Sequence, residues 1–315
     1  MKRKILMITA FCFLISVLTI GTPESEAEAV KTKIETVRTD TFSMDYFRFG
    51  HGGKTLVILP GLSVESVMKY ADAVADAYSI LTDDFTIYLF DRRKELFKEG
   101  YTVFDMARDT AASIRSLGLD RVCLFGASQG GMIAMAMAID EPEFISKLVF
   151  GSTAAAMKTE QYHSIGKWVR LAEEGDAEGL YLAFGEAIYP LKVFEQSREV
   201  LAQSAKGVTE EELARFVILA EAMKDFDVTE QLTKISCPVL VLGSADDQVL
   251  GAEASEQIAE KLKGRPDCEV YMYDGYGHAA YDLAPDYKER MLRFLLREWP
   301  PFDSGASQNA GSHRP

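Results

Sequence analysis

Histidine and cysteine are both scarce in this sequence, with four of each among 315 residues. They do not occur at the spacing of a zinc site, and no glycine-rich dinucleotide fingerprint is present. Cys123, Cys237 and Cys268 lie in or beside apolar runs, which favours buried thiols, although a disulfide between Cys237 and Cys268 stays an open alternative. The sequence therefore predicts neither a bound metal nor a cofactor.

Positive charge is also in short supply. The 34 lysines and arginines stand against 48 aspartates and glutamates, so the formal net charge is -14. An excess of carboxylates repels a phosphate backbone, and the body of the chain has no run rich in lysine or arginine. Nucleic acid is therefore not expected as a partner. The hydrophobic fraction of 48% is ordinary for a globular protein and supplies ample material for a core.

The N-terminal residues differ from the rest of the chain. Three basic residues at 2–4 precede an apolar run over 5–20, and Ala27 and Ala29 follow as small residues two apart. This order is typical of a secretory signal peptide over 1–29, with cleavage after Ala29. The alternative is an uncleaved anchor, since the run is near the lower length limit for spanning a bilayer. We expect an exported protein, with membrane association only through this segment.

Short apolar runs alternate with longer helical patterns over most of the chain. Runs rich in branched and aromatic residues predict buried strands at 55–59, 86–90, 122–125, 147–150, 239–242 and 269–273. Helical spacing occurs at 103–117, 129–140, 252–262 and 285–299. Two runs around Thr36 and Tyr46 predict an antiparallel edge. This alternation predicts an α/β fold with a mostly parallel sheet that helices cover on both faces.

One long region interrupts the alternation. Residues 154–227 contain helical patches but no buried strand, and this region is too long for a plain connection. We therefore expect a helical insertion that divides the core into a first part, 30–153, and a second part, 228–299. Residues 300–315 are rich in proline, serine, glycine and asparagine, which predicts a disordered tail.

A serine stands at the sharpest turn signal of the chain. Gly126, Ser128 and Gly130 form a G-x-S-x-G pattern that directly follows the run at 122–125 and leads into the helical pattern at 129–140. A serine at such a strand-to-helix turn adopts a strained backbone that exposes its hydroxyl, and flanking glycines avoid collisions across the turn. The helix N-terminus adds amides and a positive dipole. Ser128 is the predicted nucleophile.

A serine hydroxyl needs a general base, and the chain offers few histidines. His278 follows the last strand run and precedes the last helical pattern, which places it at the sheet edge expected for Ser128. The acid that orients the imidazole should follow the run at 239–242. Asp246 is the predicted acid, and Asp247 is the neighbour that can replace it. The order serine, aspartate, histidine is the one expected for this type of sheet.

Stabilising the oxyanion of an acyl-transfer reaction takes two hydrogen-bond donors. The backbone amide of Gln129, next to the nucleophile, is the first candidate. The second is the amide of Leu62, in the loop that begins with Pro60-Gly61 after the run at 55–59. A plain turn explains this Pro-Gly pair equally well, so the second donor stays open.

These residues resemble the α/β-hydrolase superfamily over nearly all of the chain after the N-terminal segment. The resemblance rests on the segments LVILPG, YLFDRR, LFGASQGG, CPVLVLGSADDQV and YDGYGHAAYD. It implies an eight-stranded sheet with a helical cap between strands six and seven, where 154–227 lies, and it implies Asp246 as the aspartate. Two loops depart from the usual pattern. Pro60-Gly61 stands where His-Gly is common, and residues 91–95 (DRRKE) replace a glycine-rich loop.

The predicted triad indicates a serine hydrolase that cleaves a small-molecule ester or related acyl substrate through an acyl-enzyme on Ser128. Aromatic residues of the insertion, such as Trp168, are compatible with an apolar acyl group. A proline iminopeptidase-like aminopeptidase is the alternative, because Glu173, Glu174 and Glu186 are available to hold a free amine. A non-catalytic ligand-binding protein on the same fold is a third hypothesis.

Overall fold

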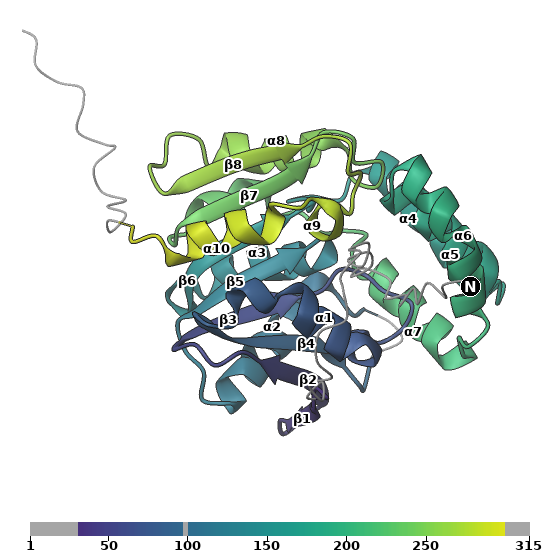
Figure 1. Ribbon diagram of the computed structural model, residues 1–315, viewed down its shortest axis with the longest axis horizontal. Coiled ribbons are helices and arrows are strands. Elements are labelled where there is room, and N and C mark those ends of the chain that lie inside the picture. The colour runs from purple at the N-terminus through teal and green to yellow at the C-terminus, as the bar shows by residue number, and fades with distance from the viewer. Residues whose placement is uncertain (1–30, 97–99, 300–315) are drawn as a thin grey trace, which may run out of the picture.

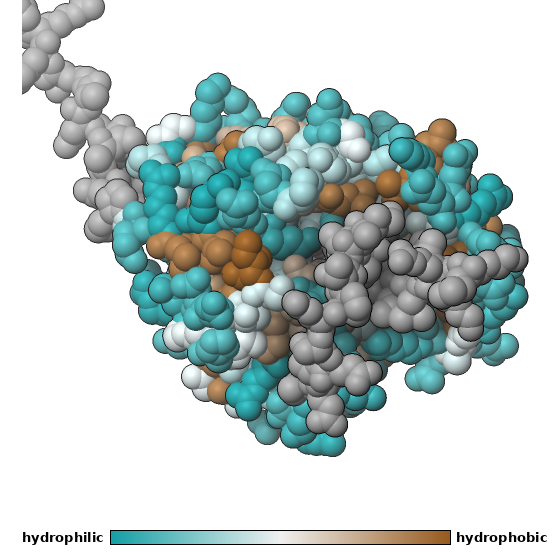
Figure 2. Space-filling view, viewed as in Figure 1, coloured by the Kyte–Doolittle hydropathy of each residue, from teal (hydrophilic) through white to brown (hydrophobic). Residues whose placement is uncertain are grey.

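The computed structural model describes residues 31–96 and 100–299. The predicted signal peptide, 1–29, and the predicted tail, 300–315, lie outside the described residues. None of the helices in the described stretches combines the length and the apolar character that crossing a bilayer takes. On the face shown in Figure 2, most of the described surface is hydrophilic and apolar residues gather in a few patches.

An eight-stranded sheet forms the centre of the molecule (Figure 1). Its strands are β1 (Ile34–Arg38), β2 (Ser43–Phe49), β3 (Lys54–Leu59), β4 (Phe85–Arg93), β5 (Val122–Ala127), β6 (Ile145–Gly151), β7 (Val239–Ser244) and β8 (Cys268–Tyr273). They lie in the order β1-β2-β4-β3-β5-β6-β7-β8, with β3 to β8 parallel and β1 and β2 antiparallel at one edge. The predicted mostly parallel sheet and its antiparallel edge are confirmed, and each of the six predicted strand runs lies within one of these strands.

Helices lie on both sides of the sheet. They are α1 (Ala71–Ala77), α2 (Val103–Ser116), α3 (Gln129–Asp140), α8 (Ala252–Lys261), α9 (Ala280–Leu283) and α10 (Tyr287–Leu296), with short 3-10 helices at Val67–Tyr70, Ser79–Leu81, Pro142–Phe144 and Thr229–Lys234. In Figure 1, α1 and α10 lie in front of the sheet, and α2 and α3 lie behind it. Strands β5 and β7 are buried along their whole length, which suits continuous apolar runs covered on both faces.

The helix predicted over 285–299 is shorter in the structure. It ends at Leu296, and Arg297 is extended with ψ at 133°. The ammonium of Lys147 donates hydrogen bonds of 2.6 Å to the carbonyls of Leu295 and Arg297. Because the last carbonyls of a helix have no donor within the helix, this lysine stabilises the end at that point.

Four helices stand between β6 and β7 along the chain: α4 (Thr159–Glu173), α5 (Ala177–Ile188), α6 (Leu191–Ala205) and α7 (Glu210–Glu221). We call α4 to α7 the insertion helices, and Figure 1 shows them together at one end of the sheet. Trp168 and Phe184 pack in their centre, with ring centroids 4.4 Å apart. An antiparallel bridge between Ala156 and Asp227 joins the start and the end of this segment. The insertion helices therefore leave and rejoin the core at one place.

Candidate active site

Ser128 lies on the turn between β5 and α3, with φ at +51° and ψ at -122°. This region of backbone space is costly for a residue with a side chain, so the surroundings must hold it. The amide of Ser128 donates to the carbonyl of Gly151 at 2.8 Å, and the hydroxyl of Thr153 donates to the carbonyl of Ser128 at 2.7 Å. These contacts fix the turn to the end of β6, and they keep the strained serine in place.

The two glycines of the turn allow a very close approach of backbones. A Cβ atom on Gly126 would lie 2.3 Å from the carbonyl oxygen of Gly130. A Cβ atom on Gly130 would lie 2.0 Å from the carbonyl oxygen of Leu59, at the end of β3. No side chain fits at either distance, so glycine is required at both positions. The start of α3 is thereby pressed against the end of β3, where the loop that contains Leu62 begins.

His278 pairs with Asp247, and the prediction of Asp246 as its partner is wrong. The Nδ1 atom of His278 lies 2.8 Å from Oδ2 of Asp247, and the two residues are 2% and 8% exposed. The carboxylate of Asp246 is turned elsewhere: it accepts hydrogen bonds from the hydroxyl of Ser244 at 2.8 Å and from the amide of Gly277 at 3.0 Å. Asp246 therefore holds the backbone just before His278, while Asp247 contacts the imidazole.

The turn after β7 explains why Asp247, and not Asp246, contacts the imidazole. The Oδ1 atom of Asp247 accepts hydrogen bonds from the amides of Val249 and Leu250, at 2.8 and 3.0 Å. An aspartate that bonds the backbone two residues later forms a compact turn. This turn leaves Oδ2 free to face the imidazole, and it holds the carboxylate rigidly.

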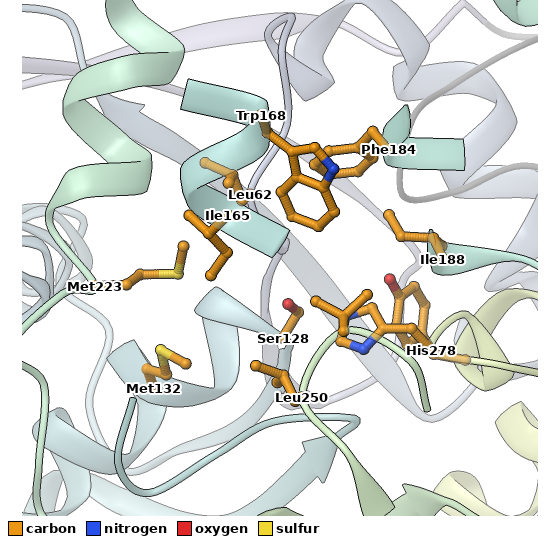
Figure 3. A pocket seen from close by; sticks show the side chains of 12 residues that line it. Leu62, Ser128, Met132, Ile165, Trp168, Phe184, Ile188, Met223, Leu250 and His278 are labelled. Atoms are coloured by element: carbon orange, nitrogen blue, oxygen red, sulfur yellow. The ribbon is translucent and has the colours of Figure 1, made fainter. Parts of the chain in front are cut away.

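Ser128 and His278 line the same pocket. Figure 3 shows the hydroxyl of Ser128 beside the His278 ring. The other lining side chains are apolar or aromatic: Leu62, Met132, Ile165, Trp168, Phe184, Ile188, Met223, Val249, Leu250 and Tyr281. Several of them belong to α4 and α5, so the insertion helices provide a wall over the serine. Within the described residues, no charged carboxylate, lysine or arginine lines this pocket.

Of the two predicted oxyanion donors, Leu62 lines this pocket and Gln129 directly follows Ser128 in the chain. Gln129 is the first residue of α3, where backbone N–H groups have no acceptor within the helix. Leu62 is 4% exposed and lines the pocket beside Ser128. The close approach at Gly130 brings the loop of Leu62 next to the start of α3. The structure thus brings Ser128, His278 and Leu62 to one pocket, and Asp247, not Asp246, contacts the imidazole.

Sequence reasoning missed Tyr281 as a neighbour of the predicted base. Its ring meets the His278 ring edge-on, with centroids 6.1 Å apart and planes at 85°. Tyr281 is 1% exposed and lies in α9, three residues after the histidine. The signal that could have found it is the helical spacing of an aromatic residue just after His278. Its ring packs against one side of the imidazole and keeps solvent away.

Cys123, Cys237 and Cys268 are free thiols, which removes the open alternative of a Cys237–Cys268 disulfide. Burial raises the pKa of Cys237 to about 12 and that of Cys268 to about 11. Both thiols are therefore protonated at neutral pH and are poor nucleophiles. Across residues 31–96 and 100–299, no group of three or more histidine, cysteine or carboxylate side chains is placed to hold a metal ion.

A buried carboxylate connects the loop after Leu62 to the insertion helices. Glu65 accepts hydrogen bonds from the ammonium of Lys69 at 2.6 Å and from the hydroxyls of Tyr70 at 2.6 Å and Tyr181 at 2.9 Å. Burial and the neighbouring Glu65 carboxylate raise the pKa of Tyr181. Because Tyr181 belongs to α5, these bonds hold the insertion against the core beside the pocket.

Comparison with known proteins agrees with this architecture. The model of the family described as "Serine aminopeptidase, S33" (Hydrolase_4) matches residues 54–282, more than half of the chain. Among similar sequences, "Putative carbamate hydrolase RutD" of Agrobacterium fabrum (strain C58 / ATCC 33970) is 28% identical over 225 residues, covering 69% of this chain and 85% of that protein.

Solved structures share the fold at low sequence identity. The α/β hydrolase MGS-M2 from a Medee basin deep-sea metagenome library superposes with a TM-score of 0.75 at 20% identity, covering 85% of this chain and 99% of that one. The enol-lactonase from Burkholderia xenovorans LB400 gives a TM-score of 0.71 at 16% identity, covering 84% and 100%. The chain therefore belongs to the Hydrolase_4 family of the α/β-hydrolase superfamily, and it is a hydrolase of that fold.

Proposed function

We propose that this hydrolase cleaves an ester of a small apolar acyl group, through an acyl-enzyme on Ser128. The observation that carries the proposal is the apolar pocket that opens directly onto Ser128 and His278. Ligand pockets bind apolar groups by removing them from water, and a few polar groups fix their orientation. Apart from Ser128, His278, Trp168 and Tyr281, the lining side chains carry no polar N–H or O–H group, so most of the surface is suited to an acyl chain.

The proposed reaction uses each polar group in one role. The Ser128 hydroxyl attacks the ester carbonyl while the Nε2 atom of His278 takes its proton. Asp247, bonded to Nδ1, holds the tautomer in which Nε2 is the base, and it stabilises the imidazolium that forms. The amides of Gln129 and Leu62 stabilise the oxyanion. The alcohol leaves with the proton from His278, and a water molecule activated by the same imidazole then releases the acid.

The alternatives have less support. An aminopeptidase needs a carboxylate near the scissile bond to hold the substrate ammonium, yet Glu173, Glu174 and Glu186 are all exposed and none of them lines the pocket. A carbamate, as named for the RutD relative, has a polar nitrogen next to its carbonyl, whereas most of the side chains that line this pocket are apolar. A pure ligand-binding role leaves the His278–Asp247 pair without a purpose.

The test is hydrolysis of p-nitrophenyl esters from acetate to octanoate by the chain from Val30 onward. We expect saturable turnover with a clear optimum in chain length, because the apolar walls of the pocket limit the space for an acyl group. Intact-mass measurement during turnover should show an acyl adduct that peptide mapping places on Ser128. A wild-type protein that is inert on every ester but cleaves aminoacyl-proline or carbamate substrates would contradict the proposal.

Trp168 is expected to set the length of the acyl group. Its side chain lies over the pocket next to Phe184, so Trp168→Leu removes the benzo ring and opens space for about two more methylene groups (Figure 3). Each buried methylene contributes about 0.8 kcal/mol, so we expect the ratio of kcat/KM for octanoate over butyrate to rise by about tenfold. Parallel kinetics on both esters measure it.

Phe216→Leu is the matched control for this change. Phe216 is a fully buried aromatic residue of α7 that packs against Phe184 but does not line the pocket. Its replacement should lower the thermal stability and leave the chain-length ratio within about twofold, since no acyl contact is removed. An equal shift of the ratio in both variants would mean that looser insertion helices, and not the Trp168 ring, determine the preference.

We also propose that the protein is exported, with cleavage after Ala29 and Val30 as the first residue of the mature chain. The support is the order of basic, apolar and small residues in 1–29. N-terminal sequencing of the full-length chain expressed in a bacterial host tests it. A cytoplasmic chain that retains its first residues would argue against export, and an intact chain in the membrane fraction would indicate an anchor.

A further inference from the structure

A buried arginine connects the two sides of the proposed oxyanion hole. Arg92, near the end of β4, is 4% exposed. Its Nη2 atom donates to the carbonyl oxygen of Pro60 at 2.7 Å and to Oε1 of Gln129 at 3.2 Å. Pro60 begins the loop that contains Leu62, and Gln129 carries the first oxyanion donor on its own backbone. One guanidinium nitrogen thus reaches both segments whose amides must converge on the oxyanion.

The neighbouring arginine has a different surrounding, because successive side chains of a strand point to opposite faces. Arg93 donates to Oδ1 of Asp109 at 3.3 Å and to the carbonyl oxygen of Thr41 at 3.3 Å. These contacts hold β4 against α2 and against the turn between β1 and β2. Arg92 and Arg93 therefore offer a natural comparison. They are adjacent, of one type and similarly buried, but only Arg92 contacts Pro60 and Gln129.

The side chain of Gln129 extends this connection to the insertion. Its Nε2 atom donates to the carbonyl oxygen of Leu219 in α7 at 2.6 Å. Leu219 is near the end of α7, where helix carbonyls lack donors within the helix, so the glutamine fills a vacant acceptor. Arg215 of α7 in turn donates to the carbonyl oxygens of Arg92 at 3.1 Å and Arg93 at 2.8 Å. Helix α7, β4 and the nucleophile turn thus form one hydrogen-bonded unit.

We propose that Arg92 and the side chain of Gln129 are positioning residues that hold the two oxyanion donors in register. The inference rests on the proposed function, because it takes the amides of Gln129 and Leu62 as the donors. Neither side chain touches the substrate. The planar guanidinium fixes two acceptors in one geometry, which an apolar side chain cannot do. Without it, the loop of Leu62 can shift relative to α3, and the hole no longer matches the transition state.

The expected kinetic signature is a loss in kcat with little change in KM. An oxyanion hole stabilises charge that develops only in the transition state, so its distortion affects catalysis more than ground-state binding. A misplacement of about 1 Å costs on the order of a hundredfold in rate. We therefore expect Arg92→Met and Gln129→Met each to lower kcat by about 30- to 100-fold, with KM changed by less than about threefold.

Two further variants separate positioning from simple stability. Arg92→Lys keeps the charge but lacks the planar guanidinium and its reach, so it should hold the two acceptors less firmly, and kcat should lie between those of the wild type and Arg92→Met. Arg93→Met is the matched control. It removes the ion pair with Asp109 and should lower the melting temperature, yet it should leave kcat within about threefold of the wild type, because no contact to Pro60 or Gln129 is lost. Should Arg93→Met fail to fold, Arg93→Lys takes its place.

A second readout does not depend on ester turnover. A fluorophosphonate probe reacts when the Ser128 oxygen bonds to phosphorus, fluoride leaves and the hydroxyl proton passes to His278. Negative charge grows on the phosphoryl oxygen, which the same amides stabilise. The labelling rate of Ser128 should therefore fall in Arg92→Met and Gln129→Met as kcat does, by about 30- to 100-fold, and stay near the wild-type rate in the Arg93 control.

These measurements distinguish the two proposals. If the wild type is labelled but cleaves no ester, the proposed ester function fails, and the labelling rates still decide the role of Arg92. A folded Arg92→Met protein that is labelled at the wild-type rate would overturn the inference, because Arg92 then serves stability alone. Equal losses in the Arg92 and Arg93 variants would overturn it as well. A wild type that is not labelled at all would overturn both the nucleophile and the hole.

Discussion

Replacing Asp247 with asparagine should lower kcat/KM on the order of a thousandfold or more on the best ester substrate. The carboxylate of Asp247 lies 2.8 Å from Nδ1 of His278, and in the proposed mechanism it accepts a hydrogen bond from the Nδ1–H group. An asparagine offers an amide N–H₂ group in that position, which favours the wrong imidazole tautomer and leaves Nε2 protonated. The general base is then missing, although shape and packing are nearly unchanged. Steady-state kinetics at neutral and alkaline pH measure the loss.

Asp246→Asn is the internal control for this result. Asp246 bonds Ser244 and the amide of Gly277, and an asparagine keeps one oxygen acceptor for these partners. We expect a loss of about tenfold or less, with a lower melting temperature because the loop before His278 is held less firmly. A larger loss at Asp246 than at Asp247 would mean that the carboxylates exchange roles when substrate binds. The Asp247 assignment would then be wrong.

Removing the side chain of Ser128 or of His278, the two residues between which the proton is proposed to pass, should reduce activity as strongly as Asp247→Asn does. Ser128→Ala and His278→Ala should each lower kcat on the order of a thousandfold or more, because the hydroxyl is a weak nucleophile without its base. Groups that act as one unit give strongly non-additive losses, so the double variant should be about as impaired as either single one. Progress curves with the optimal p-nitrophenyl ester, run at high enzyme concentration, measure all three.

The outcome that would contradict this mechanism is retained activity in Ser128→Ala. Folding is checked by circular dichroism, since alanine must adopt the same backbone with φ at +51°. If the loss of kcat in the double variant equals the product of the two single losses, Ser128 and His278 act in separate steps. The Arg93→Met variant serves as the comparison for both results, because Arg93 is also buried in the core but bonds Asp109 and Thr41.

Much of the fold was predictable because strands at the centre of the sheet are buried on both faces. Strands such as β5 and β7 are buried along their whole length and are apolar at most positions, and a continuous apolar run bounded by turn residues is visible in the sequence. The nucleophile was predictable for a related reason. Glycine is needed where two backbones approach too closely for a Cβ atom, as they do at Gly126 and Gly130. The two glycines therefore mark the position of the turn in the sequence.

Whether Asp246 or Asp247 contacts His278 depends on the folded structure of the turn after β7. It is made by hydrogen bonds of Asp247 to the amides of Val249 and Leu250, which exist only once the turn has formed. Adjacent carboxylates with equal chemistry cannot be ranked by residue type. A family offset counted from the strand end is also uncertain by one position, since a turn can gain or lose a residue.

The lining of the pocket was predictable only as a tendency. The insertion is visibly aromatic, yet Trp168 and Phe184 line the pocket, whereas Tyr181 bonds Glu65 and Tyr162 contacts Glu221 at the surface. Which aromatic faces which way depends on how four helices pack against one another and against the core. Such long-range packing leaves no local signal, so the sequence could indicate an apolar binding site but not its walls.

The bridge between Ala156 and Asp227 has a consequence for how the substrate range of such a protein can change. Both ends of the insertion leave the core side by side, so a different set of helices can be exchanged without altering the path of β6 or β7. Three of the hydrogen bonds between core and insertion have a backbone acceptor, because Arg215 donates to the carbonyls of Arg92 and Arg93 and the Gln129 side chain donates to that of Leu219. Backbone acceptors are present in every sequence. A new set of insertion helices that supplies an arginine and a helix end in the right places therefore keeps these three bonds to the same core.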